Sequence, residues 1–217
     1  MAVNVTILSH YRSGIYWLIE ILKNNMPKVH IYPEDNFAHL EVSRHPGVDK
    51  AIFLVRDGRD CMVSSYSCNV QRAKNDSGWQ EGTQWKNLEF KETLRWNYRE
   101  VLNKKKEVIN RLNPVQYWKK YNQDWLDDKT ITKLIIRYED LHHDQANQMQ
   151  LIRKFYGLPE KEIMVIDNKK SCSYEYKPTN IYTPRTPGNW KKIFEDEDND
   201  YFWEIAGETM ERLGYEK

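Results

Sequence analysis

The first two dozen residues combine an apolar strand, a tight turn and a helix, and this combination constrains the fold more than any other feature. Val3–Leu8 is β-branched and apolar, as expected of a buried strand. Arg12, Ser13 and Gly14 form the turn, and Gly14–Leu22 carries apolar residues at helical spacing. Because the first N–H groups of a helix lack internal partners and the helix dipole adds positive charge, the pattern predicts a site for a phosphate or sulfate.

The charge balance limits the class of partner. The chain has 33 Lys+Arg and 32 Asp+Glu residues, a net charge of +1, so no global field attracts nucleic acid or an anionic membrane. No run approaches the roughly 18 apolar residues of a membrane span, and no targeting segment is evident. Three cysteines without metal-ligand spacing favour reduced thiols. We therefore expect a cytoplasmic protein with a single domain over residues 1–217.

Further apolar runs predict the fold class. Ala51–Val55 and Leu134–Tyr138 indicate buried strands, and Val29–Tyr32 and Leu40–Ser43 indicate shorter ones. Because these strands alternate with helical segments, we expect a three-layer α/β fold, a central parallel sheet of about five strands flanked by helices. Ligands of such sheets bind beyond the carboxyl ends of the strands.

Four other segments have helical patterns. They are Asp60–Val70, the long charged stretch Leu88–Leu112 closed by Pro114, Asn147–Tyr156 and Glu204–Leu213.

A second polar cluster follows the second strong strand. Arg56–Asp60 stands directly after Val55, and Ser64 lies about one turn inside the expected helix, which Asp60 can cap. The Arg56 guanidinium could hold a phosphate that Ser64 also contacts. The alternative is a salt bridge between Arg56 and Asp60 that closes the loop.

Two more clusters have the same character. Tyr138 ends the third strong strand and could face a base or hydrogen-bond a ligand, and Glu139 or Asp140 is expected to cap the next helix. Arg185–Lys191 is a glycine turn flanked by cations, which could fold over a nucleotide. Alternatively, Trp190 anchors this turn in the core.

Together the clusters resemble the sulfotransferases that use 3′-phosphoadenosine-5′-phosphosulfate (PAPS). The family's first loop, Y-P-[KR]-S-G-[TN]-[TS]-W, corresponds to His10–Trp17, and its second signature, R-[DN]-x-[RK]-D-x-x-x-S, matches Arg56–Ser64 in full register. Tyr138–Asp140 is similar to the third signature, and Gly188–Lys191 to the closing G-D-W-K.

The resemblance implies a P-loop-like sulfotransferase fold and transfer of a sulfuryl group from PAPS to a hydroxyl or amine of a small molecule or glycan. The adenosine 3′,5′-bisphosphate (PAP) product leaves, and no metal takes part. The residues assigned to the 5′-phosphosulfate are Arg12, Ser13, Gly14, Ile15 and Tyr16, with Arg12 on the leaving side. Those assigned to the nucleotide are Trp17 and Tyr138 at the adenine, Arg56 and Ser64 at the 3′-phosphate, and Arg185 and Gly188 over the 3′-phosphate side.

Several positions differ from the family pattern. Tyr11 replaces the usual proline, Ile15 and Tyr16 replace small polar residues, and Asn189 replaces the aspartate of the last motif. The altered pair after Gly14 leaves open an alternative, a non-catalytic member that only binds PAPS or PAP. A kinase or nucleotidase is the other alternative, which the absence of G-x-x-x-x-G-K-[ST] disfavours.

The acceptor needs a base to remove its proton as it attacks sulfur. Many members of the family use a histidine just after the strand that precedes the second signature, and His45 stands in the matching window. His39 is the second candidate and Glu41 the third. All three could instead be surface residues of a short connector.

An aromatic group stands between the second and third strong strands. Trp79, Trp85, Trp96 and Tyr98 could line an acceptor pocket, but aromatic residues at helical spacing more often belong to a core.

Overall fold

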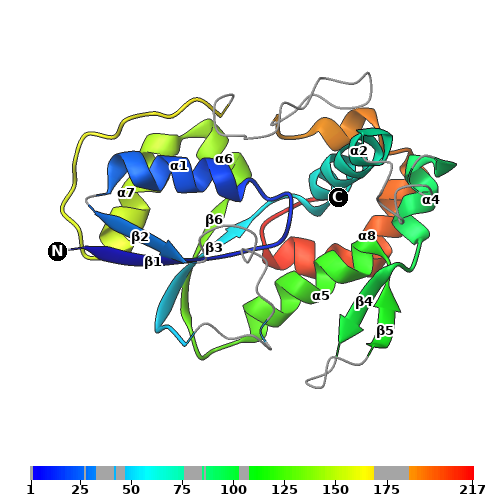
Figure 1. Ribbon diagram of the computed structural model, residues 1–217, viewed down its shortest axis with the longest axis horizontal. Helices are drawn as coiled ribbons and strands as arrows, with labels where there is room; N and C mark the ends of the chain where they lie inside the picture. Colours follow the sequence, from blue (N-terminus) through cyan, green and yellow to red (C-terminus); the bar gives the residue numbers. More distant parts are fainter. Residues whose placement is uncertain are drawn as a thin grey trace. The chain divides into compact units, whose positions relative to one another are not determined.

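A computed structural model describes residues 2–26, 28–32, 42, 47–75, 85, 87–102, 108–168 and 186–217. Its elements divide into two compact units, each built from two stretches of the chain (Figure 1). Unit 1 comprises Met1–Arg56 and Asp124–Glu175, and unit 2 comprises Asp57–Gln123 and Tyr176–Lys217. The expectation of one domain over residues 1–217 stays a prediction.

Unit 1 contains a parallel sheet. Its described strands are β1 (Val3–Ser9), β2 (Val29–Tyr32), β3 (Lys50–Val55) and β6 (Thr132–Arg137), in the order β2-β1-β3-β6. All neighbouring strands are parallel, which confirms the predicted α/β class. The further strand expected at Leu40–Ser43 lies almost entirely outside the described residues.

The register of the sheet brings the polar clusters of unit 1 together. Ser9 at the end of β1 is the partner of Leu54, and Val55 at the end of β3 is the partner of Arg137. The carboxyl ends of β1, β3 and β6 therefore meet at one edge of the sheet. Residues 10–14, Arg56 and Tyr138 all leave the sheet at this edge, where α/β proteins bind ligands.

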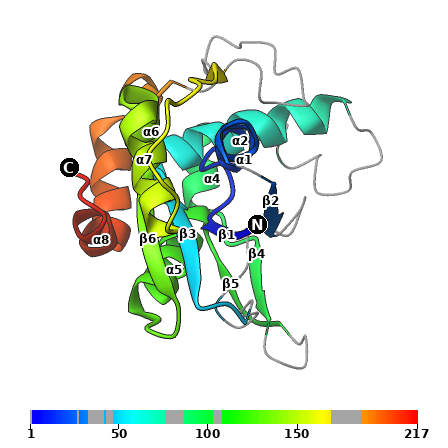
Figure 2. The same cartoon turned by 90° about the vertical axis from the view of Figure 1, so that its left-hand side faces the viewer.

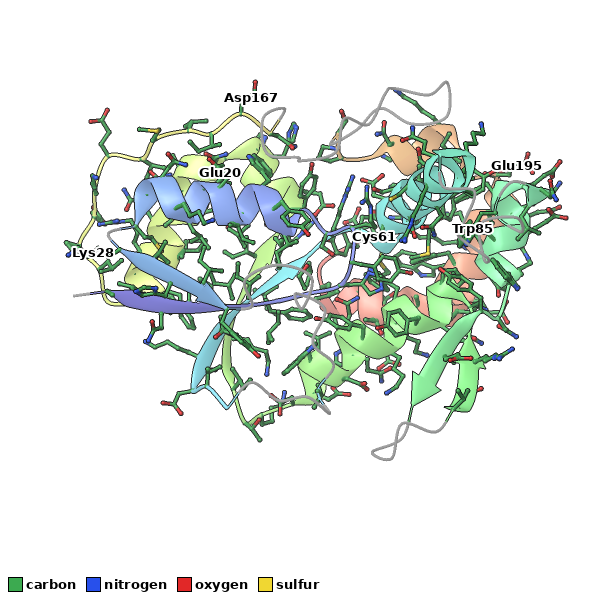
Figure 3. The ribbon with its side chains drawn as sticks, viewed as in Figure 1. Glu20, Lys28, Cys61, Trp85, Asp167 and Glu195 are labelled. Carbon is green, nitrogen blue, oxygen red and sulfur yellow. The ribbon has the colours of Figure 1, made fainter. Side chains whose placement is uncertain are left out.

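Three helices of unit 1 share a hydrophobic core with these strands: α1 (Ile15–Asn25), α6 (Tyr138–His143) and α7 (Gln145–Phe155). Leu18, Ile21 and Leu22 of α1 are completely buried, and each such side chain contributes roughly 1.5–3 kcal/mol by leaving water. Glu20 lies on the exposed side of the same helix (Figure 3). In Figure 2, α6 leads directly into α7. The pattern of apolar residues thus sets which face of α1 packs inward.

Side-chain amides tie the segment after α7 to the rest of unit 1 (Figure 1, yellow). The Asn25 amide donates to the Met164 carbonyl over 2.9 Å and accepts from the Met164 N–H over 2.8 Å. Gln145 makes the same pair of bonds with Ile166, over 3.0 and 2.6 Å. The Trp17 indole N–H also donates to the Ile166 carbonyl, over 2.9 Å. These bonds satisfy backbone groups that no neighbouring strand pairs.

A turn organised by Asp128 leads into β6. Its carboxylate accepts from the Thr130 hydroxyl over 2.6 Å and from Lys133 Nζ over 3.1 Å. Burial would raise the pKa of Asp128, but hydrogen bonds from Thr130 and Lys133 and the charge of Lys133 lower this pKa to about 2. Because the folded pKa lies below the unfolded one, the stabilisation is present at neutral pH and is lost as the pH falls towards 2.

Unit 2 is mainly helical. Its elements are α2 (Gly58–Asn75), α4 (Phe90–Arg95), the hairpin β4 (Arg99–Leu102) and β5 (Val108–Leu112), most of α5 (Pro114–Asp127), the 3₁₀ helix η3 (Asn189–Lys192) and α8 (Asp196–Arg212). Helix α2 starts against α5 and α8, because a Cβ on Gly58 would overlap the Phe202 ring and lie 2.8 Å from Trp118. Only glycine fits at this position of the Arg56–Asp60 motif.

The prediction of one helix over Leu88–Leu112 is wrong. After the short helix α4 the chain forms the antiparallel hairpin β4–β5, in which Glu100 faces Arg111 and their side chains form an ion pair of 3.1 Å. The β-branched residues Val101 and Val108 favour strands, and cross-strand pairing outweighs the helical spacing of the charged residues.

Pro114 begins a helix and does not close one. The Asn113 carboxamide oxygen accepts from the Gln116 N–H over 2.9 Å, and the Gln116 carboxamide oxygen accepts from the Asn113 N–H over 3.1 Å. This reciprocal cap, with proline at the first helical position, starts α5. The prediction overlooked that proline suits the first turn of a helix.

Two predicted caps are also wrong. Helix α2 starts before Asp60, and Asp57 caps it by accepting from the Arg59 N–H over 2.9 Å. Helix α6 starts directly at Tyr138, so Glu139 and Asp140 lie inside its first turn. Their charges still suit the positive end of the helix dipole. Both helices begin earlier than the polar residues suggested.

Candidate functional site

The first loop of unit 1 has an unusual backbone. β1 ends at Ser9 and α1 begins at Ile15, and between them both Arg12 (φ +70°) and Gly14 (φ +92°) adopt left-handed conformations. The Ser13 N–H donates to the His10 carbonyl over 3.3 Å and closes the turn. A left-handed arginine costs about 1 kcal/mol or more, so other contacts must hold this loop in place.

Gly14 lies against the ring of Tyr138. A Cβ at Gly14 would lie 2.5 Å from Tyr138 Cδ2 and 2.6 Å from Cε2, closer than real Cβ atoms approach. The Tyr138 side chain is 2% exposed, and its hydroxyl accepts from the Asn168 amide over 2.8 Å. The Tyr138 ring therefore packs against the loop that precedes α1. Through this contact the chain after β6 lies close to the start of α1.

Arg56 joins these two features. Its Nη1 donates to the Arg12 carbonyl over 3.2 Å, and its guanidinium lies 4.4 Å from the centre of the Tyr138 ring. Arg56 is 3% exposed. One cation thus contacts the loop after β1 and the residue after β6 while standing at the end of β3. In unit 1 the structure brings together Arg12, Ser13, Gly14, Arg56 and Tyr138, and their roles at a nucleotide stay predictions.

The residues that open α1 point in different directions. Ile15 and Trp17 are buried in the core of unit 1, whereas Tyr16 is 48% exposed. Trp17 packs edge-on against Tyr138 at 5.6 Å between ring centres. The N–H groups of Ile15 and Tyr16 are among those that a helix cannot satisfy internally. The start of α1 therefore offers backbone N–H groups as hydrogen-bond donors.

The remaining predicted site residues of the described chain belong to unit 2. Ser64 is buried within α2 at 1% exposure, and Gly188 precedes η3 with φ +79°. His39, His45 and Arg185 lie outside the described residues. Their assignments stay predictions.

Glu41, the third candidate base, and Trp79 also lie outside the described residues. The other three aromatic residues of the proposed acceptor pocket pack on one another. Trp85 contacts Trp96 and Tyr98 with ring centres 5.5 and 5.4 Å apart, and Trp85 is only 2% exposed. This packing favours the core interpretation for these three rings.

The sequence did not indicate that two residues of the second signature, Arg59 and Asp60, contact the closing motif. Arg59 stacks on Trp190 at 3.6 Å, and Asp60 accepts hydrogen bonds from the backbone of Gly188 and Trp190. The cation and carboxylate of Arg56–Asp60 and the aromatic ring of the closing motif were visible as sequence features. No local pattern indicates that they pair across about 130 residues.

Neither a membrane span nor a metal cluster is found in the part of the chain that the structure describes. None of its helices is long and apolar enough to cross a bilayer. No group of three or more His, Cys, Asp or Glu side chains there could hold a metal ion.

Comparison with known proteins identifies the family. The sulfotransferase domain family matches residues 48–214, most of the chain, and the chain therefore belongs to this family. The match begins after the first loop and α1, so the features of residues 10–17 are independent of it. No curated protein sequence matches significantly.

A solved structure shows the same fold. The crystal structure of mouse sulfotransferase SULT7A1 complexed with PAP has a TM-score of 0.61 to this chain at 17% identity, and the alignment covers 96% of this chain and 84% of the mouse chain. The predicted sulfotransferase fold is thus confirmed.

We predict that Gly14→Ala destabilises the protein by about 2–4 kcal/mol, because the new methyl group meets the Tyr138 ring and the backbone has a positive φ. Gly157→Ala is the matched control, because Gly157 has φ +70° with nothing within 4 Å of an added Cβ. We expect the control to lose only about 1 kcal/mol. Urea unfolding measures both values, and equal losses would contradict the close packing of Gly14 on Tyr138.

Proposed function

We propose that this protein is a PAPS-dependent sulfotransferase that transfers a sulfuryl group to a hydroxyl or amine of a small molecule or glycan. The observation that carries the proposal is the contact of Arg56 with the Arg12 carbonyl and the Tyr138 ring, at the edge where β1, β3 and β6 end. The family match supports the same reaction class. We further propose a cytoplasmic enzyme that acts as a single domain and needs no metal.

The donor set at the first loop fits a phosphosulfate. Gly14 leaves no Cβ between the backbone and the Tyr138 ring, and the backbone N–H groups of Ile15 and Tyr16 at the start of α1 suit an anion. Arg12 adds a full positive charge and Ser13 a hydroxyl. When bound, PAPS supplies the sulfuryl group, which leaves the 5′-phosphate oxygen for the acceptor. Arg12 and the N–H groups stabilise the negative charge that develops on the leaving side.

The rest of the nucleotide has its own residues. Arg56 and Ser64 hold the 3′-phosphate, and Arg185 and Gly188 cover that side. Tyr138 and Trp17 lie by the adenine. Both rings are almost completely buried, Tyr138 at 2% and Trp17 at 4% exposure. A planar guanidinium can donate two parallel N–H bonds to one phosphate, which an ammonium cannot, and this favours arginine at position 56.

The acceptor side depends on a base. We propose that His45 removes the proton of the attacking hydroxyl or amine, with His39 and then Glu41 as the other candidates. In-line transfer places this base opposite Arg12. The base and the residues that hold the nucleotide are then different residues. Their effects on turnover and on nucleotide affinity can therefore be measured separately.

We predict that Arg56→Ala weakens PAP binding at least tenfold in isothermal titration calorimetry, about the effect of one lost charge-assisted contact. Lys50→Ala is the control, because Lys50 is a cation at the opposite end of the same strand, and we expect it to bind PAP as the wild type does. Unchanged affinity in Arg56→Ala, or an equal loss in both variants, would contradict the assignment of the 3′-phosphate site.

We predict that His45→Ala lowers the rate of sulfuryl transfer by about 10²-fold or more and leaves PAP affinity nearly unchanged, because a base acts on the acceptor and not on the nucleotide. Turnover with PAPS and calorimetry with PAP separate the two quantities. If His45→Ala is fully active and His39→Ala is not, the base is His39.

The same assays distinguish the alternatives. A protein that binds PAP but shows no transfer to a broad panel of acceptors would be a non-catalytic family member, in line with the burial of Ile15 where the family has a small polar residue. Phosphoryl transfer that requires Mg²⁺ would instead indicate a kinase or nucleotidase.

A further inference from the structure

Asp60 binds the turn of the closing motif with both carboxylate oxygens. Its Oδ2 accepts from the Gly188 N–H over 2.7 Å, and its Oδ1 accepts from the Trp190 N–H over 2.9 Å. Asp60 lies in the first turn of α2 and is 1% exposed. Hydrogen bonds between a carboxylate and backbone N–H groups are about twice as strong as neutral ones, and burial limits competition from water.

A second contact fixes the same turn. The Arg59 guanidinium lies 3.6 Å from the centre of the Trp190 ring and is 2% exposed. Asp57 holds this guanidinium with two hydrogen bonds, from Nε over 3.1 Å and from Nη2 over 2.9 Å. Asn199 accepts from Nη1 over 3.0 Å. The Trp190 ring therefore rests on a cation that cannot easily move.

The turn itself has few internal bonds. The Lys191 N–H donates to the Gly188 carbonyl over 3.2 Å, and no side chain within the turn caps η3. The Gly188 and Trp190 N–H groups, which donate to Asp60, stand at the start of the 3₁₀ helix, where backbone N–H groups have no internal partners. The conformation of Gly188–Trp190 therefore depends on its contacts with Arg59 and Asp60 of α2.

We propose that Asp60 is a positioning residue that holds Gly188–Trp190 in its ligand-ready conformation before the nucleotide binds. The inference rests on the proposed function, in which Gly188 covers the 3′-phosphate. Because the turn is ordered in advance, binding of a 3′-phosphorylated nucleotide does not carry the cost of ordering it. Asp60 thereby sets the preference for PAP over nucleotides that lack the 3′-phosphate, without contacting either.

The first test needs no ligand. Asp60→Asn keeps the shape of the side chain but turns an amide group towards a backbone N–H, so one of the two bonds is lost. We expect the Gly188 and Trp190 amides to exchange hydrogen about tenfold faster or more in the variant. Asp198→Asn is the control, because Asp198 is another buried carboxylate in the first turn of a helix of unit 2 and pairs with Arg95. Unchanged exchange in Asp60→Asn would overturn the proposal.

The second test separates positioning from general stability. Calorimetry with PAP and with adenosine 5′-monophosphate compares ligands that differ only in the 3′-phosphate. We expect Asp60→Asn to bind PAP about tenfold more weakly and the monophosphate within about twofold of the wild type, and Asp198→Asn to bind both normally. An equal loss for both ligands would reduce Asp60 to a structural residue and overturn the proposal.

The two tests also separate this inference from the proposed function. If the wild type fails to bind PAP, the proposed function is wrong, and hydrogen exchange still decides whether Asp60 orders the turn. If the wild type binds PAP and Asp60→Asn binds it equally well, the proposed function stands and the positioning role is wrong.

Discussion

The contact of Arg56 with the Arg12 carbonyl and the Tyr138 ring is the interaction on which the site of unit 1 depends. Three strands end at one edge of the sheet, and each contributes one partner to this contact. The left-handed backbone of Arg12 costs energy, and the hydrogen bond from Arg56 opposes its relaxation. In the proposed function the same Arg56 guanidinium also holds the 3′-phosphate of the nucleotide, so one group would serve both the structure and the binding.

Gly14 completes this arrangement. Because Gly14 has no Cβ, the backbone can lie directly against the Tyr138 ring at the residue that precedes α1. The Tyr138 hydroxyl is in turn tied to Asn168, and the segment before Asn168 is tied to Asn25 and Gln145. A chain of side-chain contacts thus extends from the first loop through much of unit 1, which explains how a strained loop is held in one conformation.

Much of unit 1 could be predicted from the sequence, because its strands are rich in apolar and β-branched residues. Ala51–Val55 is buried along its whole length, and neither its length nor its β-branched residues suit a helix. The hairpin in Leu88–Leu112 could not be predicted in this way, because its strands are short and their charged residues also fit a helix. Its structure depends on pairing such as that of Glu100 with Arg111.

Some residues of the candidate site could likewise be predicted from the sequence, and others could not. The residue types at Arg12–Gly14, Arg56 and Tyr138 predict an anion site, since each stands at or shortly after the end of a recognisable strand. The roles of Arg59 and Asp60 could not be predicted, because Gly188 and Trp190 are distant in the sequence and hydrogen bonds to a backbone N–H leave no signature in the residue type that donates. The base cannot be derived from strand ends either, because His45 follows no strong apolar run.

The activity that we propose for this member of the sulfotransferase family is transfer of a sulfuryl group from PAPS. Incubation of the purified protein with PAPS that carries a radiolabelled sulfuryl group, a panel of phenols, alcohols, amines and saccharides, and a metal chelator tests this claim most directly. We expect the label to pass to at least one acceptor class and added PAP to suppress the transfer. Absence of transfer from PAPS to every acceptor would contradict this activity, and Mg²⁺-dependent phosphoryl transfer from a nucleoside triphosphate would in addition indicate a kinase or nucleotidase.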